Sequence, residues 1–264
     1  MKNPSNRNKN QQKAVSMVSE MKTVVITGGS SGLGLAMAHR FRQGGYQVVI
    51  VSRKERENLP CDRFYSCDLT VAEERAGLIK RLLADGIVPD VWINNAGIGV
   101  YALSEEITDK DLRKIMELNY FAPLELSMEI LPVLKKNNGS LVQICSIASL
   151  MPLCCMSTYS SSKSALLMFN ESLRMETDVH LLSVMPGRID TGFSSRAVKM
   201  RECPDTPGNR SSSPDKLADK VFNAVLKRRK TLIYPAWYRV VVFFSRLFPA
   251  ITRKVSRRIW ELDK

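Results

Sequence analysis

The feature that most constrains this chain is a regular alternation between short apolar runs and longer amphipathic stretches. The runs are rich in Val and Ile and carry almost no charge, which is typical of strands buried on both faces of a parallel sheet. Because stretches of helical period separate them, the pattern predicts right-handed βαβ units in one doubly wound α/β domain with helices on both faces. The expected strands are Thr23–Thr27, Val48–Ser52, Phe64–Cys67, Asp90–Asn94, Ser140–Cys145, Val179–Met185 and 231–234. The expected helices cover 35–45, 71–84, 109–135, 158–177 and 214–228.

The chain divides into three parts of different composition. Residues 1–20 are polar and low in complexity, so we expect a disordered basic extension. Residues 21–235 form the single folded domain, and residues 236–264 form a basic tail of amphipathic helices. No charge-free apolar stretch reaches the length of a membrane span and no apolar segment follows the basic N-terminus, so we predict a cytoplasmic protein. Six cysteines without a CxxC pair predict neither a metal site nor a disulfide framework.

A glycine-rich segment, Thr27–Gly34, lies between the first expected strand and the first expected helix. Glycines allow a tight turn and close approach of the backbone, and free N–H groups at the start of the helix bind a pyrophosphate. The segment therefore predicts a dinucleotide site that includes Gly28, Ser30, Ser31, Gly32, Leu33 and Gly34.

The end of the second expected strand indicates which dinucleotide is bound. A carboxylate at this place would bind the ribose 2′-hydroxyl of NAD, but the chain has Ser52 followed by Arg53. Because a guanidinium suits a 2′-phosphate, we predict NADP(H) as the cofactor. Asp68, at the end of the third strand, is a candidate for binding the adenine edge.

A tyrosine and a lysine four residues apart, Tyr159 and Lys163, open the expected helix 158–177. This spacing places the ammonium and the phenol on one helical face. A neighbouring cation favours the ionised phenol, so the pair is suited to moving a proton to or from a carbonyl oxygen.

Together these motifs resemble the short-chain dehydrogenase/reductase family along essentially all of residues 21–235. The resemblance implies a Rossmann-type fold and an oxidoreductase. The matching segments are TGGSSGLG (27–34), NNAG (94–97), Asn119, Ser146 thirteen residues before Tyr159, YSSSK (159–163) and PGRIDT (186–191).

The resemblance also implies a role for each matching residue. Tyr159 would be the general acid in reduction and the base in oxidation, while Lys163 would lower the pKa of the phenol and hold the nicotinamide ribose. Ser146 would stabilise charge on the substrate oxygen, and Asn119 would complete a proton relay through water to Lys163. Further cofactor contacts would come from Asn95, Ala96, Gly97, Pro186, Gly187, Ile189 and Thr191.

Two further expectations follow from the family. A homodimer or homotetramer would pair through the long helices that carry Asn119 and Tyr159. The aperiodic loop from Phe193 to Asp215 would cover the substrate and order on binding. Apolar residues in its first part would suit an apolar substrate: Phe193, Ala197, Val198 and Met200.

The net charge of +13 is concentrated at the two ends of the chain. Residues 1–20 carry four Lys or Arg and one Glu, and residues 221–264 carry eleven against two acidic residues. No nucleic-acid-binding motif accompanies this charge, so no nucleic-acid partner is expected.

In the tail, Arg239 and Arg246 would share one helical face, and Pro249 should break the helix. Basic residues beside large apolar ones are typical of a helix in a membrane interface, which would place the protein on the cytoplasmic face of a membrane. The alternative is a helix that packs on a dimer partner or on its own domain. The apolar side would comprise Trp237, Val240, Val241, Phe244 and Leu247.

The sequence therefore predicts an NADPH-dependent reductase of a lipophilic ketone, similar to family members that reduce long-chain 3-keto lipids, sphingoid precursors or steroids. Two alternatives stay open. One is an NADP-linked alcohol or hydroxysteroid dehydrogenase with a soluble substrate. The other is a non-catalytic NADPH-binding scaffold or sensor.

Overall fold

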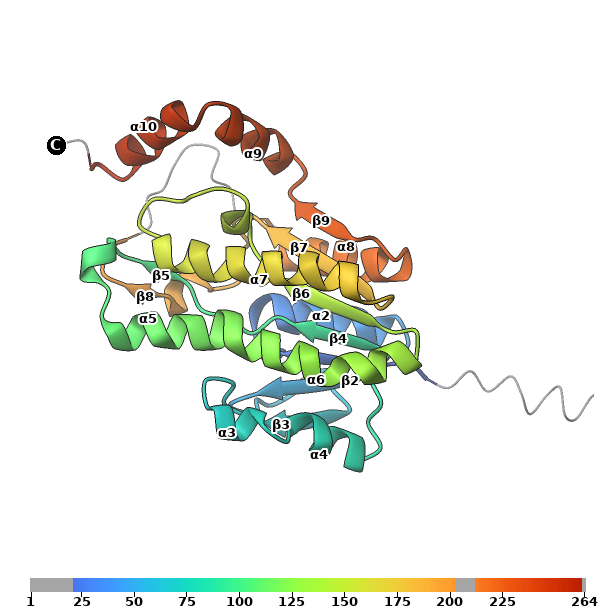
Figure 1. Ribbon diagram of the computed structural model, residues 1–264. Helices are drawn as coiled ribbons and strands as arrows, with labels where there is room; N and C mark the ends of the chain where they lie inside the picture. The colour runs from blue at the N-terminus through green and yellow to red at the C-terminus, as the bar shows by residue number, and fades with distance from the viewer. Residues whose placement is uncertain (1–20, 203–211, 263–264) are drawn as a thin grey trace, which may run out of the picture.

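The fold is built around one parallel sheet, as the computed structural model of residues 21–202 and 212–262 shows (Figure 1). Its seven strands follow the order β3-β2-β1-β4-β6-β7-β9, with every neighbouring pair parallel. The order runs outward in both directions from the β1–β4 junction, which confirms the predicted doubly wound α/β fold. The expected extension at 1–20 lies outside the described residues. The strands are β1 (Thr23–Thr27), β2 (Gln47–Ser52), β3 (Arg63–Ser66), β4 (Val91–Asn94), β6 (Ser140–Ile144), β7 (His180–Pro186) and β9 (Thr231–Tyr234).

Helices cover both faces of this sheet, and two hydrophobic cores result. Side chains alternate along a strand, so Val24 and Ile26 of β1 enter one core and Val25 enters the other. The first core lies under α2 (Gly32–Gln43) and α8 (Pro214–Leu226). The second lies under α4 (Leu78–Ala84), α6 (Ala122–Lys136) and α7 (Ser157–Glu176). Figure 1 shows α6 and α7 in front of the sheet and α2 behind it.

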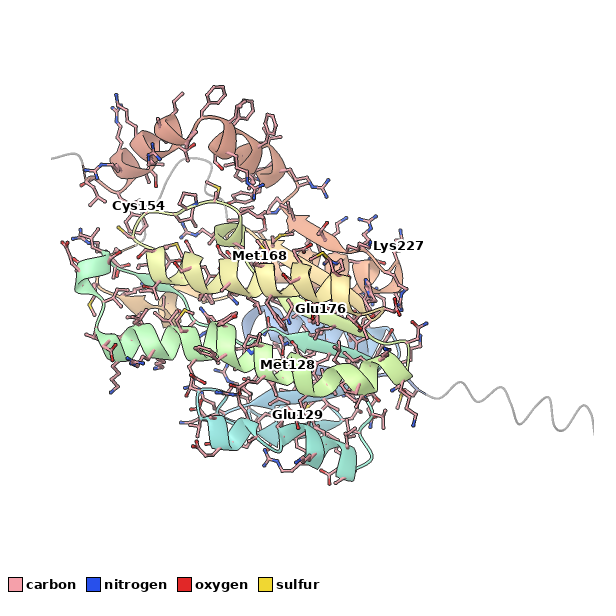
Figure 2. The ribbon with its side chains drawn as sticks, viewed as in Figure 1. Met128, Glu129, Cys154, Met168, Glu176 and Lys227 are labelled. Carbon is pink, nitrogen blue, oxygen red and sulfur yellow. The ribbon has the colours of Figure 1, made fainter. Side chains whose placement is uncertain are left out.

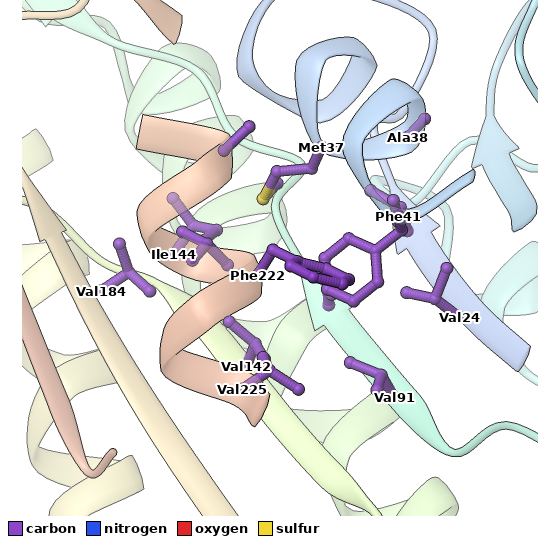
Figure 3. Packing of buried hydrophobic residues seen from close by; sticks show 14 of the residues in the cluster. Val24, Met37, Ala38, Phe41, Val91, Val142, Ile144, Val184, Phe222 and Val225 are labelled. Atoms are coloured by element: carbon purple, nitrogen blue, oxygen red, sulfur yellow. The ribbon is translucent and has the colours of Figure 1, made fainter. Parts of the chain in front are cut away.

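Aromatic packing joins α8 to α2 behind the glycine-rich loop (Figure 3). The rings of Phe41 and Phe222 meet edge to face, with centroids 5.1 Å apart at 80°. The ring of Tyr46 lies 5.1 Å from Phe41 in the same arrangement, which is the favoured geometry for aromatic pairs. The helix that follows the glycine-rich loop is therefore held by Phe222, which lies 181 positions after Phe41 in the chain.

Two of the expected helices are interrupted. The stretch 71–84 divides into α3 (Ala72–Arg75) and α4, because Gly77 between them has a φ of +117°. The stretch 109–135 consists of α5 (Asp109–Met116), a π turn (Glu117–Phe121) and α6.

Arg75 connects these two interruptions. Its guanidinium is 2% exposed and pairs with Glu117 at 2.5 Å and with Glu125 at 2.9 Å. It also donates to the carbonyl oxygen of Leu69 at 2.6 Å. The buried cation therefore ties the end of the third βα unit to the π turn.

A small second sheet lies beside the main one. β5 (Val100–Tyr101) pairs in parallel with β8 (Val198–Lys199). Two-residue strands have too little alternation to be predicted from sequence. The pairing fixes the first part of the expected substrate-covering loop against the segment that follows β4, while residues 203–211 of that loop lie outside the described residues.

The tail forms two helices, α9 (Tyr238–Leu247) and α10 (Pro249–Ile259), as the predicted break at Pro249 requires. Figure 1 shows them together above α7 and β7, apart from the sheet. The ring of Tyr238 lies against Gly187 so closely that a Cβ there would collide with it. At the other end, Trp260 stacks on Tyr101 with centroids 6.2 Å apart. Among residues 21–202 and 212–262, we find no helix with the length and apolarity that a membrane crossing requires.

Replacing Phe222 by Ala should destabilise the domain by about 3–5 kcal/mol, because the cavity left between α2 and α8 cannot refill with another ring. Urea unfolding followed by circular dichroism measures this difference. Met168→Ala, at a side chain that is 67% exposed, is the control and should change stability by about 0.5 kcal/mol or less. A loss at Phe222 no larger than at Met168 would contradict the packing described.

Candidate active site and cofactor cleft

A large cleft opens at the carboxyl ends of the strands, where the strand order reverses between β1 and β4. Its volume is about 1440 Å³, and it runs from the end of β2 past Tyr159 to the inner side of α9 and α10. Open α/β sheets bind their ligands at this place. The volume exceeds that of most single-ligand pockets, so the cleft has room for a dinucleotide and a second molecule.

The glycine-rich loop at the floor of the cleft is a cradle that larger residues could not form. Gly28 has a φ of +64°, a conformation that favours glycine. A Cβ on Gly34 would lie 2.6 Å from the amide nitrogen of Asn95 and would also collide with the carbonyl oxygen of Gly28. The Asn95 amide donates to the carbonyl oxygens of Thr27 at 2.9 Å and Gly28 at 3.2 Å, which holds the loop in place.

The N-terminus of α2 faces the cleft without a competing anion. Ser31 precedes the helix but makes no side-chain cap, and the first turn holds no acidic residue. The first N–H groups and the positive end of the helix dipole are thus available to a phosphate. These features fit the pyrophosphate of a dinucleotide.

The far end of the cleft, beyond β2, is basic. Arg53, Lys54 and Arg56 line it, and no carboxylate stands at the end of β2. The hydroxyl groups of Ser30 and Ser52 lie 2.8 Å apart and connect the glycine-rich loop to this end.

Asp68 lines the cleft just after β3. Its Oδ1 accepts from the N–H of Thr70 at 2.9 Å and from the hydroxyl at 2.7 Å. Burial alone would raise the pKa of Asp68, but these hydrogen bonds and the cations Arg53 and Lys114 lower it. The carboxylate is therefore ionised and available as a hydrogen-bond acceptor.

The three polar groups expected around the substrate meet in the middle of the cleft. Ser146 follows β6, and Tyr159 and Lys163 lie on the buried face of α7, one helical turn apart. The Lys163 ammonium donates to the carbonyl oxygen of Ile144 at 2.9 Å. The Ser146 hydroxyl accepts from the N–H of Ala148 at 3.1 Å, which fixes its position.

The expectation that Lys163 lowers the pKa of Tyr159 is wrong, because Lys163 is not among the groups that shift this pKa. Burial raises the pKa of Tyr159 to about 12, although a hydrogen bond with Ser146 acts in the opposite direction. Burial also lowers the pKa of Lys163 to about 8. The effect of burial on the two pKa values is thus larger than the effect of placing the two groups one helical turn apart.

Asn119 lies behind the cleft, within the π turn. Its side chain bonds Ile98 in both directions, since Oδ1 accepts from the Ile98 N–H and Nδ2 donates to the Ile98 carbonyl oxygen, each at 2.9 Å. A Cβ on Gly97 would lie 3.1 Å from Asn119 Oδ1 and 3.4 Å from Lys163 Nζ. Asn119 Oδ1 and Lys163 Nζ therefore both lie close to Gly97, and the water that would connect them stays a prediction.

The structure brings nearly all of the sequence-predicted residues to this one cleft. Gly32 and Asn119 stand just behind its lining. The remainder line it: Gly28, Ser30, Ser31, Leu33, Gly34, Arg53, Asp68, Asn95, Ala96, Gly97, Ser146, Tyr159, Lys163, Pro186, Gly187, Ile189 and Thr191.

Sequence reasoning kept packing of the tail on its own domain only as an alternative and did not identify the tail residues that line the cleft. Tyr238, Val241 and Ser245 of α9 line it, as does Trp260 after α10. The spacing of the first three residues at i, i+3 and i+7 marks one helical face and was the available signal. Because the large residues around them suggest an outer surface, this inner face is hard to recognise from sequence.

Comparison with known proteins agrees with the geometry. The family model described as short chain dehydrogenase matches residues 22–202. An Arabidopsis thaliana protein called 11-beta-hydroxysteroid dehydrogenase-like 4A is 28% identical over 90% of this chain and 84% of its own length. A Bacteroides thetaiotaomicron 3-ketodihydrosphingosine reductase is 30% identical over 65% of each chain. A solved short-chain dehydrogenase from Sphingobium yanoikuyae in complex with NADPH is 25% identical, has a TM-score of 0.73 and covers 89% of this chain and 95% of its own.

The lowered pKa of Lys163 predicts that the Lys163→Met variant is more stable to unfolding than the wild-type protein. At pH 7 the wild-type side chain is buried and charged, and a shift from 10.5 to about 8 corresponds to about 3 kcal/mol of lost stability. The variant should therefore be more stable than wild type by about 1–3 kcal/mol without cofactor, after allowance for the lost hydrogen bond.

The pH dependence of this stability difference tests the prediction. Between pH 8 and 10.5 the unfolded state still binds the proton that the folded state has released, so wild-type stability rises with pH and the gain in Lys163→Met disappears. Chemical denaturation at pH 7 and pH 10 measures this. Lys216→Met, on the exposed side of α8, is the control and should differ from wild type by a constant amount. A gain that persists at pH 10 would contradict the assignment.

Proposed function

Because the chain belongs to the short-chain dehydrogenase/reductase family and is thus an oxidoreductase acting between a carbonyl and an alcohol, we propose that it reduces a lipophilic ketone with NADPH at a membrane surface. The observation that carries the proposal is the shape of the cleft. The part that contains Ser146 and Tyr159 continues beneath α9 and α10, so the substrate would meet an apolar roof.

Three cations support NADPH as the cofactor. Arg53, Lys54 and Arg56 gather where the ribose 2′ position would lie, and a guanidinium can bind a phosphate through two hydrogen bonds. A site for NAD would instead present a carboxylate to the 2′-hydroxyl.

The polar residues of the cleft have the chemistry that carbonyl reduction needs. When bound, the reduced nicotinamide supplies a hydride to the carbonyl carbon. Tyr159 donates its phenolic proton to the carbonyl oxygen, and the Ser146 hydroxyl donates a hydrogen bond to the same oxygen. Lys163 is charged at pH 7 and offsets the negative charge left on the phenol.

The raised pKa of Tyr159 supports reduction over oxidation. A pKa of about 12 keeps the phenol protonated at neutral pH, and this is the form that donates a proton. Oxidation of an alcohol needs the phenolate. NADPH preference and a protonated Tyr159 therefore favour the same direction.

The substrate end of the cleft is apolar. Leu153 and Met156 line it from the loop before α7, Phe193 from the loop after β7, and Val241 and Val255 from the tail. Figure 2 labels Cys154, whose loop lies between α7 and the tail helices. Apolar walls of this extent would favour a long-chain 3-keto lipid, a sphingoid precursor or a steroid over a short polar ketone.

The outer side of the tail supports attachment to a lipid surface. Large apolar side chains are exposed there together with basic ones, and a monomeric protein rarely leaves so many exposed without a partner surface. Anionic lipid would attract the basic residues while the apolar ones enter the acyl boundary. The exposed apolar residues that do not line the cleft are Trp237, Phe243, Leu247 and Phe248, and the exposed basic residues are Arg239, Arg246, Arg253, Lys254, Arg257 and Arg258.

A second exposed surface supports a homodimer. Met128 of α6 and Met168 of α7 are exposed, and Figure 2 shows both on the face turned to the viewer. Met175, two helical turns further along α7, is exposed as well. Pairing through α6 and α7, which is common in the family, would cover all three.

Replacing Tyr159 by Phe should lower turnover at least about a hundredfold, because the proton donor is lost while the ring stays. NADPH binding should stay within about twofold of wild type. NADPH consumption is measured with short-chain ketones, a 3-ketosteroid and a long-chain 3-keto lipid.

Each result with this panel has one meaning. Turnover of the long or steroidal ketones that is lost in Tyr159→Phe supports the proposal. Turnover of short ketones alone favours the soluble-substrate dehydrogenase. Tight NADPH binding without turnover of any ketone favours the non-catalytic scaffold.

Lipid attachment predicts that Phe243→Ser combined with Leu247→Ser reduces binding to phosphatidylserine-containing vesicles about tenfold or more. Both side chains are exposed, by 62% and 56%, and neither lines the cleft. Co-sedimentation measures binding, and turnover of a short ketone should be unchanged. Val88→Ser, an exposed apolar residue outside the tail, is the control. Equal co-sedimentation of the tail variant and wild type would show that the tail does not attach the protein to lipid.

A further inference from the structure

The segment Thr191–Val198 lies between the cofactor half and the substrate half of the cleft. On one side it contacts the glycine-rich loop, since a Cβ on Gly32 would lie 3.0 Å from Thr191 Cβ and 3.4 Å from a guanidinium nitrogen of Arg196. On the other side the ring of Phe193 lies 5.9 Å from that of Tyr159. The segment therefore contacts both the residue that opens α2 and the candidate proton donor.

Arg196 presents an unneutralised charge at this place. Its Nη2 donates to the carbonyl oxygen of Thr191 at 3.1 Å, which directs the guanidinium across Gly192 towards Gly32. Within residues 21–202 and 212–262, no carboxylate forms an ion pair with it. The side chain is exposed and lines the cleft, so most of its donors face the cavity.

The group opposite Arg196 is the uncapped N-terminus of α2. The N–H groups of its first turn and the guanidinium thus converge on one part of the cleft from two sides, and neither has an acidic partner in the first turn or on the segment. Two convergent sets of positive donors match an anion with oxygens on both sides, as a pyrophosphate has.

We propose that Arg196 binds the pyrophosphate of the nicotinamide dinucleotide and so holds the Thr191–Val198 segment over the cofactor. The inference rests on the proposed function, because it requires a dinucleotide in the cleft. It assigns to Arg196 a task different from that of Arg53, since the pyrophosphate is common to NADPH and NADH while the 2′-phosphate belongs to NADPH alone.

The same contact connects cofactor binding to the substrate half. Ser194 Oγ lies 3.0 Å from the Tyr101 hydroxyl, and Val198 pairs with Val100 in the small sheet. A cofactor that fixes Arg196 would thereby fix Phe193 beside Tyr159. The bound dinucleotide would thus stabilise the position that Phe193 already has in the apolar wall.

The test compares three ligands on purified full-length protein by titration calorimetry. NADPH carries both the pyrophosphate and the 2′-phosphate, NADH carries the pyrophosphate alone, and adenosine 2′-monophosphate carries the 2′-phosphate alone. Arg196→Gln should weaken NADPH and NADH by the same factor, about tenfold or more, and leave adenosine 2′-monophosphate within about twofold of wild type. Arg53→Ala should do the reverse, weakening NADPH and adenosine 2′-monophosphate but not NADH.

Two further variants separate a local contact from general effects. Arg196→Lys keeps the charge without the fork and should recover part of the lost affinity. Lys199→Gln removes a charge from the same stretch of chain but does not line the cleft, so all three affinities should stay unchanged. Thermal unfolding without ligand should be the same for all these variants, because Arg196 is exposed.

The outcomes are distinct. Unchanged dinucleotide affinities in Arg196→Gln would overturn the inference, as would a loss confined to NADPH, which would place Arg196 on the 2′-phosphate. Wild-type protein that binds neither dinucleotide would overturn the proposed function as well. Binding without turnover would affect the proposed reductase activity and leave the role of Arg196 supported.

Discussion

The cleft depends on the close contact between the glycine-rich loop and the segment after β4. The Thr27 hydroxyl accepts the N–H groups of Asn95 at 2.9 Å and Ala96 at 3.1 Å, while the Asn95 amide returns a bond to the Thr27 carbonyl oxygen. Because Gly34 carries no Cβ, which would collide with Gly28, α2 can begin directly against this pair of segments. The ends of β1 and β4 are thus fixed side by side, and every group in the cleft is placed relative to them.

The cleft joins two parts of the chain with opposite character. Its floor consists of backbone N–H groups and a few polar side chains at the strand ends, and these positions follow from the sheet itself. Its roof consists of tail helices held by Tyr238 on Gly187 at one end and Trp260 on Tyr101 at the other. The polar floor of the cleft and the roof formed by the tail therefore come from different regions of the chain.

Sequence alone could predict the sheet and most of the floor, because both depend on local patterns. The uncharged sequence of a strand such as Thr23–Thr27 indicates that it is buried, and the run of glycines after it indicates the loop. The interruptions of the helices could not be predicted in this way. The π turn is associated with the buried pairing of Arg75 to Glu117 and Glu125, which joins residues 42 and 50 positions apart and leaves no periodic signal.

The pKa values of the central pair show the same limit. Spacing along α7 correctly places Tyr159 and Lys163 one turn apart, but their protonation depends on how deeply the surrounding elements bury them. The role proposed for Arg196 is similar, since it depends on the proximity of Gly32, which lies more than 160 residues earlier in the chain. The groups of the central pair are close together in the sequence, but the residues that determine their environment are far away in the chain.

The π turn has one more consequence, which concerns chain length. A π turn holds one residue more than an α-helical path between the same two ends, so removing any one residue from Glu117–Phe121 would restore a continuous helix. Each residue of an α-helix turns the chain by about 100°. Such a deletion would leave α5 and α6 in place but rotate the side chains within the turn, which would turn Asn119 away from Ile98. The correct placement of these side chains is thus specified by the number of residues as well as by their identity, and a single-codon deletion here would be more damaging than most substitutions.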